Sequence, residues 1–317
     1  MSTMKIGMCF PRELPAALIT TFAERLDAAG VDELWVIEDC FYTAGPSLAA
    51  AALARTEHLT VGIGILPAVA RTAAMTAMEL ATLAALGPGR LIAGIGHGVQ
   101  EWMAQMGVRP ASPLTALEEV ISAVRRLLAG EALDVQGDYV TLRNVTLDQP
   151  PDPVPPVLAG VRGPRSLAVA GAVADGLVLA ELSGPTAVRE AIAAAAPTRP
   201  FQVAVYSPVH IDRDRRTARA AVAPLVCQLV GDPPAGLRAA PFFDELAALV
   251  RRDGASGVVG MPDDWWTELA AVGTPDDVAA HIAALATAGA TSIALFPPPT
   301  VDGAREQRDR VLSMIIR

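Results

Sequence analysis

Strand-length apolar runs alternate with amphipathic helical stretches from one end of this chain to the other. The alternation predicts strands at residues 5–10, 33–38, 60–66, 90–95, 157–161, 176–180, 202–209 and 291–296, and helical stretches separate nearly all of them. The runs are continuously apolar, as parallel strands buried on both faces should be. Eight such strands fit a (β/α)8 TIM barrel better than a six-stranded doubly wound sheet, so we predict an α/β barrel.

One segment interrupts the alternation. Residues 134–145 contain Gln136-Gly137-Asp138 between two short runs, which predicts a β-hairpin inserted between the fourth and fifth strands. Near the other end of the chain, residues 213–252 are predicted to form a long helical region. The length of 317 residues suits one barrel, so we predict a single TIM-barrel domain over residues 1–317.

Composition excludes several classes of protein. Hydrophobic residues make up 52% of the chain, which rules out a disordered polymer. The 34 acidic residues outnumber the 25 lysines and arginines and give a formal charge of −9, which argues against a nucleic-acid surface. The sequence has no signal-peptide pattern and no long apolar span, so we expect a cytoplasmic protein with no membrane partner. Cys9, Cys40 and Cys227 form no paired motif, so we expect neither a disulfide framework nor a metal site.

In a barrel of this kind, the active site lies at the carboxyl ends of the strands. Glu38 and Asp39 stand at the end of the second predicted strand. In an extended strand they point in opposite directions, so at most one of them faces the barrel mouth. A structural role, in capping a helix or binding an arginine, and a catalytic role, in donating a proton or bonding a ring, both remain open for them.

The end of the fourth strand is rich in glycine. Gly94-Ile95-Gly96-His97-Gly98 is not a dinucleotide fingerprint, because Glu101 occupies the place of the third glycine. The glycines are expected to thin the strand end so that a flat group can approach the backbone. His97 is a candidate for an acid/base or ligand-orienting role, since its pKa lies near neutrality. His58 and His281 fall on helix-like segments and are expected at the surface.

The run from Gly160 to Ser166 leads from the fifth strand into a helix. Pro164 suits the first helical turn, and the free amide groups there form a cradle for an anion, to which Arg162 and Arg165 add charge. The alternative is an ordinary helix start with two solvated arginines. We favour phosphate because this turn faces the active-site end of a barrel. The chain has no motif for a metal or a nucleophile, which indicates an enzyme that takes its chemistry from a cofactor.

Five motifs, in this order along the chain, carry a resemblance to a known family. They are Leu34-Trp35-Val36-Ile37-Glu38-Asp39, Val61-Gly62-Ile63-Gly64-Ile65-Leu66-Pro67, Gly87-Pro88-Gly89-Arg90-Leu91-Ile92-Ala93-Gly94-Ile95-Gly96, Leu158-Ala159-Gly160-Val161-Arg162-Gly163-Pro164 with Ala170-Gly171-Ala172-Val173-Ala174-Asp175-Gly176, and Val272-Gly273-Thr274-Pro275-Asp276-Asp277-Val278. The chain resembles the luciferase-like monooxygenase superfamily. Within it, the chain is similar to the branch that uses the deazaflavin coenzyme F420, typified by methylenetetrahydromethanopterin reductase.

The resemblance implies a luciferase-like barrel, a usual homodimer and a set of site residues. A ring-bearing cofactor would contact Glu38, Asp39, Gly64, Ile65, Gly96, His97, Gly98 and Val99, and its phosphate-bearing tail would meet Ala159, Gly160, Val161, Arg162, Gly163, Pro164 and Arg165. A non-prolyl cis peptide is expected at Gly64–Ile65.

The chain also departs from the family pattern. Glu38-Asp39 stands where relatives often have Asp-His, and Val99 stands where some have a catalytic glutamate. The catalytic candidates are therefore His97, Asp39 and Glu38, with Glu101 as a further substitute for the missing glutamate.

The expected function is that of a coenzyme F420-dependent oxidoreductase that passes hydride between the deazaflavin and a C=N or C=C bond of a small organic substrate. The alternative is a monooxygenase that uses reduced FMN and O2, for which a separate reductase would supply the reduced cofactor. A non-catalytic flavin-binding barrel is a second alternative, although the strand-end glycines and the cradle that it would be expected to lose are intact.

Overall fold

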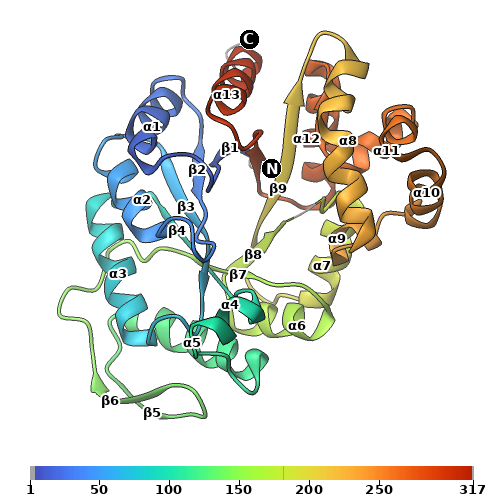
Figure 1. Cartoon of the computed structure of the whole chain (residues 1–317). Helices are drawn as coiled ribbons and strands as arrows, with labels where there is room; N and C mark the ends of the chain where they lie inside the picture. The colour runs from blue at the N-terminus through green and yellow to red at the C-terminus, as the bar shows by residue number, and fades with distance from the viewer. Residues whose placement is uncertain (1–3, 181, 316–317) are drawn as a thin grey trace. The chain divides into compact units, whose positions relative to one another are not determined.

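The computed structural model describes residues 4–180 and 182–315 and has the predicted (β/α)8 TIM-barrel fold (Figure 1). The eight predicted strands are β1 (Lys5–Phe10), β2 (Glu33–Val36), β3 (Thr60–Pro67), β4 (Leu91–Gly96), β7 (Val157–Gly160), β8 (Gly176–Leu179), β9 (Gln202–Ile211) and β11 (Ser292–Phe296). A short strand that the sequence did not predict, β10 (Ala271–Gly273), pairs with β9.

Helical connections follow most of the strands. They are η1 (Ala16–Leu18), α1 (Ile19–Ala28), α2 (Gly45–Leu53), α3 (Ala73–Leu86), α4 (Gln100–Gln105), α5 (Pro113–Leu128), α6 (Pro164–Val173), α7 (Pro185–Ala195), α8 (Arg215–Gly231), α9 (Ala235–Arg238), α10 (Phe243–Val259), α11 (Asp263–Leu269), α12 (Pro275–Ala288) and α13 (Val301–Ile315). The long helical region predicted at 213–252 is thus divided into α8, α9 and α10. Among residues 4–180 and 182–315, no helix is long and apolar enough to cross a membrane.

The contacts divide the chain into two compact units. The first unit comprises residues 12–178 and 195–202 and carries a parallel sheet in the order β2-β3-β4-β7-β8. The pairing of β3 with β4 shifts register between Ile63 and Leu66, which marks a bulge in β3. The second unit carries a parallel sheet in the order β10-β9-β11-β1.

The predicted hairpin insertion is confirmed in the first unit. Strands β5 (Leu133–Gln136) and β6 (Thr141–Val145) pair antiparallel. The carboxylate of Glu119, on α5, accepts the amide protons of Asp138, Tyr139 and Val140 at 2.8–2.9 Å. The Glu119 carboxylate therefore holds the turn of the hairpin against α5, since three charge-assisted hydrogen bonds converge on it.

One motif of the family resemblance has a structural role in this unit. Arg125, on α5, binds Asp175 with both ends of its guanidinium, Nε to Oδ2 at 2.9 Å and Nη2 to Oδ1 at 2.5 Å. Asp175 also accepts the amide proton of Val157, the first residue of β7, at 3.0 Å. The aspartate before β8 thereby joins α5 to the start of a neighbouring strand.

The prediction of a surface position for His281 is wrong. This side chain, on α12 in the second unit, is fully buried. Its Nδ1 lies 2.7 Å from the carbonyl oxygen of Thr267 and its Nε2 lies 2.9 Å from Oγ of Ser207. Burial lowers the pKa of His281 to about 4, so the imidazole is neutral at pH 7. The helical pattern located the residue on a helix but did not reveal which face is covered.

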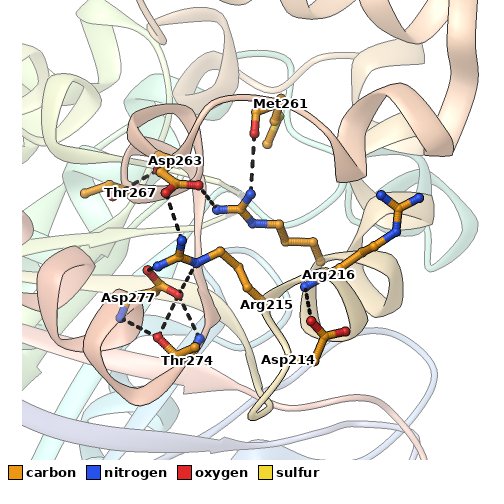
Figure 2. A network of polar contacts seen from close by, with 9 residues as sticks. Asp214, Arg215, Arg216, Met261, Asp263, Thr267, Thr274 and Asp277 are labelled. Atoms are coloured by element: carbon orange, nitrogen blue, oxygen red, sulfur yellow. Dashed lines mark hydrogen bonds and ion pairs between the residues drawn. The ribbon is translucent and has the colours of Figure 1, made fainter.

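Helices α8 to α11 enclose a small hydrophobic core of their own, in which Trp266 and Leu269 are buried. Arginines of α8 connect this core to its surroundings (Figure 2). Arg215 binds Asp263, on α11, and Asp277, on α12, at 3.0 and 2.7 Å. Arg219 is only 7% exposed; its Nη2 also binds Asp263, and its guanidinium lies over the ring of Trp266. Asp263 therefore receives two arginines of α8, and Arg215 joins α8 to both α11 and α12.

Replacing Arg219 by methionine is expected to lower the free energy of unfolding by about 1–2 kcal/mol, because the charge-assisted bond to Asp263 is lost while Asp263 remains partly solvated. Arg216→Met is the matched control on the same helix, since the Arg216 side chain is exposed and its guanidinium makes no contact in Figure 2. Urea unfolding followed by circular dichroism measures both variants. Equal midpoints would contradict a stabilising role for the network.

Candidate functional site

The two carboxylates after β2 have different partners. Glu38 accepts two bonds from the guanidinium of Arg71, Nη1 to Oε1 at 2.6 Å and Nη2 to Oε2 at 3.0 Å. The amide of Gly45, the first residue of α2, donates to Oε2 at 2.9 Å. Glu38 is therefore held by a forked ion pair and a helix N-terminus, and its side chain is only 10% exposed.

Arg71 completes this arrangement. Its Nε lies 3.0 Å from Oε2 of Glu79, on α3, so one guanidinium stands between two carboxylates. The hydrogen bonds to Glu38 raise the pKa of Arg71. The negative charge of Glu38 is thus compensated within the protein. From its sequence position, Glu38 could either bind an arginine or act on a ligand. In the structure it forms an ion pair with Arg71.

Asp39 points to another group of residues, as expected for the neighbour in an extended strand. It pairs with Nη1 of Arg12. Arg12 also binds Glu13 through Nε at 3.0 Å, and its guanidinium lies over the ring of Tyr42, 4.5 Å from the centroid. About a third of the Asp39 side chain remains exposed, 33% by area. Of the two carboxylates, Asp39 is the one that solvent and ligands can reach.

The bulge of β3 forms an apolar platform beside these carboxylates. The predicted cis peptide at Gly64–Ile65 is confirmed. The side chain of Ile65 lies across two neighbouring strands: a Cβ atom added at Gly94, Gly96 or Gly160 would come within 3.0, 3.0 or 2.5 Å of it. These three glycines therefore make room for Ile65. At Gly94 and Gly96 the atoms nearest to an added Cβ are the backbone oxygens of Ile63 and Gly160, at 2.3 and 2.5 Å, so these two glycines also allow close packing within the sheet. The approach of a flat group to this strand end stays a prediction, and the half-buried Ile65 is the side chain that it would meet.

His97 is fixed at both ring nitrogens. Its Nδ1 lies 3.1 Å from the carbonyl oxygen of Pro113, and its Nε2 lies 3.0 Å from Oγ of Ser166. A carbonyl oxygen can only accept, so Nδ1 carries the proton and Nε2 accepts from the Ser166 hydroxyl. Burial lowers the pKa of His97, and the Pro113 carbonyl opposes the effect. The imidazole is neutral at pH 7 and joins the end of β4 to α6.

The loop after His97 leads into α4. Gly98 has a positive φ of 68°, and the side-chain amide of Gln100 donates to the carbonyl oxygen of His97 at 3.1 Å. Val99, at the position where some relatives have glutamate, presents an exposed apolar side chain. Glu101, the other substitute, is exposed in the first turn of α4.

The start of α6 has the features of an anion cradle. Gly163 precedes the helix with a φ of 81° and has no side chain to cap it. The first helical bond runs from Leu167 N–H to the Gly163 carbonyl, which leaves the amides of Arg165 and Ser166 for an outside acceptor. The side chains of Arg162 and Arg165 are exposed, whereas those of Ala159 and Val161 are buried. A Cβ atom at Gly163 would meet nothing within 4 Å, so there is open space beside the residue that precedes the helix.

Aromatic side chains stand beside Asp39. Phe41 and Tyr42 are 67% and 52% exposed, and a second non-prolyl cis peptide, which the sequence did not predict, joins Cys40 to Phe41. Across the described residues, 4–180 and 182–315, we find no cluster of His, Cys, Asp or Glu that is arranged to hold a metal ion.

The structure adds three residues to those singled out from the sequence. Arg71 compensates Glu38, Arg12 compensates Asp39, and Ser166 holds His97. Arg12 lies two residues after β1 and Arg71 four residues after β3, in the loops where a barrel places its site, so their position was a usable signal. No local sequence pattern indicates the pairing of Ser166 with His97, since the two residues are 69 positions apart.

Comparisons with known proteins identify the family of this chain. A family model described as luciferase-like monooxygenase matches residues 4–292. A 5,10-methylenetetrahydromethanopterin reductase from Methanolobus tindarius is 30% identical over 239 residues, 73% of each chain. An F420-dependent glucose-6-phosphate dehydrogenase from Beutenbergia cavernae is 31% identical over 180 residues, 53% of this chain and 52% of the relative.

Solved structures show the same fold. The coenzyme F420-dependent tetrahydromethanopterin reductase from Methanopyrus kandleri superposes with a TM-score of 0.81 at 20% identity, covering 100% of this chain and 98% of that one. Because the family model spans most of the sequence and the Methanolobus relative is 30% identical over 73% of it, the chain belongs to the luciferase-like monooxygenase family and is an oxidoreductase of that family.

Proposed function

We propose that this chain is a coenzyme F420-dependent oxidoreductase that transfers hydride between the deazaflavin and a C=N or C=C bond of a small organic substrate. The proposal is supported mainly by sequence similarity to relatives named as F420-dependent enzymes or methylenetetrahydromethanopterin reductases. The anion cradle at the start of α6 supports it as well. The deazaflavin, when bound, supplies the hydride.

The residues present fit such a cofactor. The open amides of Arg165 and Ser166 and the exposed guanidinium of Arg165 suit a phosphate group. The half-buried side chain of Ile65 offers an apolar platform for a ring. In this proposal the cradle holds the tail, and Ile65 supports the ring so that donor and acceptor meet in a fixed geometry.

Proton handling is assigned to Asp39. Both nitrogens of His97 are engaged and Glu38 is locked by Arg71, whereas Asp39 is accessible and lies beside the exposed Phe41 and Tyr42. The Asp39 carboxylate pairs with Arg12, and in this proposal Asp39 accepts a proton from the substrate or returns it in the reverse direction.

Titration of the purified protein with F420 and with FMN, followed by fluorescence, tests the cofactor. We expect micromolar or tighter binding of F420 and much weaker binding of FMN. The reverse preference would contradict the proposal and favour an FMN-dependent monooxygenase. Binding of neither cofactor would leave a non-catalytic barrel.

The same titration with Arg165→Ala tests the cradle. Loss of one charge-assisted bond to phosphate is expected to weaken F420 binding about tenfold, and added salt should reduce the difference. Arg143→Ala is the matched control, because Arg143 is an exposed arginine of the β6 strand in the same unit. Equal losses in both variants would point to general attraction by the protein charge and not to the cradle.

Glu38→Gln separates a structural from a catalytic role for Glu38. The amide cannot accept both guanidinium bonds of Arg71, so we expect a loss of about 2 kcal/mol in the free energy of unfolding. Glu101→Gln, at an exposed glutamate, is the control and should change stability by less than about 0.5 kcal/mol. Unchanged stability of Glu38→Gln with loss of F420 affinity would assign Glu38 to the cofactor instead.

We also propose that the enzyme acts as a cytoplasmic homodimer on a small-molecule substrate, as the family resemblance implies. Light scattering after size exclusion is expected to give twice the chain mass of 32.9 kDa. A mass of one chain at micromolar concentration would contradict the dimer.

A further inference from the structure

We propose that Ser166 is a positioning residue that couples anion binding at the start of α6 to protonation of His97, so that His97 takes up a proton from solvent when the cofactor phosphate binds. This inference rests on the proposed function for the identity of the anion. It assigns to His97 a binding role in place of the acid/base role that its sequence position indicated.

The first step in the argument is the place of Ser166. It is the third residue of α6, and its own amide is one of the two left free by the helix start. An anion that accepts from this amide is also within reach of the side chain of the same residue, because the hydroxyl is two bonds from the backbone. In the structure, that hydroxyl is turned to Nε2 of His97, at 3.0 Å.

The hydrogen bond between Ser166 and His97 depends on a single hydroxyl proton. The Ser166 hydroxyl has one proton, and neutral His97 requires it, since Nδ1 already donates to the carbonyl of Pro113. If the hydroxyl turns to an anion, neutral Nε2 faces an oxygen that no longer donates. A proton from solvent on Nε2 restores both bonds: Nε2–H donates to Ser166 Oγ, and the Ser166 hydroxyl donates to the anion.

The third step is charge. Burial lowers the pKa of His97 and keeps the ring neutral while the cradle is empty. The elements around the ring carry seven charged residues: Glu101 on α4, Glu118, Glu119, Arg125 and Arg126 on α5, and Arg162 and Arg165 at the start of α6. Glu119 is bound by amides of the hairpin and Arg125 by Asp175, and the other five are exposed. With none of them buried against the ring, an anion at the cradle becomes the charge that decides the state of His97, through Ser166. Protonated His97 then adds a positive charge to the site.

The test uses sulfate as the probe, because its charge does not change over the pH range of histidine titration. The full chain is labelled with 15N-histidine, and the His97 signal is assigned by its loss in His97→Gln. We expect saturating sulfate, compared with chloride at equal ionic strength, to raise the proton affinity of His97 about tenfold. By linkage, sulfate should bind about tenfold more tightly at pH 5 than at pH 8.

Two variants at Ser166 make the test specific. Ser166→Ala keeps the helix amide and both arginines, so it should still bind sulfate but raise the proton affinity of His97 at most about twofold, by screened attraction alone. Ser166→Thr restores the hydroxyl and should restore the tenfold effect. An equal effect in Ser166→Ala, or no effect of bound sulfate in the unsubstituted protein, would overturn the proposal.

F420 titration in parallel separates this proposal from the proposed function. Tight F420 binding with no response of His97 to sulfate overturns the coupling and leaves the proposed function intact. Failure to bind either sulfate or F420 overturns both.

Discussion

The candidate site depends on the space that Ile65 occupies. Three strand-end positions, Gly94, Gly96 and Gly160, lack side chains, and Ile65 lies over all of them from the bulge of β3. Any side chain at Gly160 would come within 2.5 Å of it. Because protein interiors are packed without spare volume, the bulge and the three glycines form one structural unit. This unit gives the sheet edge an apolar surface between the carboxylates after β2 and the cradle at α6.

Charges around this platform are arranged in pairs that differ in accessibility. Glu38 is bound by a forked arginine and a helix amide, whereas Asp39 is bound by an arginine that remains partly exposed. A buried carboxylate is tolerated when such partners compensate it. Two adjacent residues after β2 thus have different surroundings: Glu38 is bound to α2 and, through Arg71, to α3, whereas Asp39 remains partly exposed to solvent.

Local sequence rules predicted the strands, the hairpin and the start of α6 well, because these depend on periodicity and on turn residues such as Gly137 and Pro164. The cis peptide at Gly64–Ile65 followed from the family resemblance alone. Partners were harder to predict: Arg71 is 33 residues from Glu38, and Ser166 is 69 residues from His97, so no local pattern joins them. The packing of Ile65 against the glycines of β4 could not be predicted, because a missing side chain does not tell which group fills the space. His281 was misplaced because alanine-rich helices show little contrast between their faces.

Every residue of the platform, the carboxylate pairs and the cradle belongs to the first unit, between Arg12 and Ser166. The second unit has its own sheet and its own hydrophobic core in α8 to α11. Substitutions that accumulate in that second core change none of the residues of the platform, the carboxylate pairs or the start of α6. One part of such a chain can therefore diverge in sequence while these residues are kept, which is one way in which a single fold comes to serve several functions.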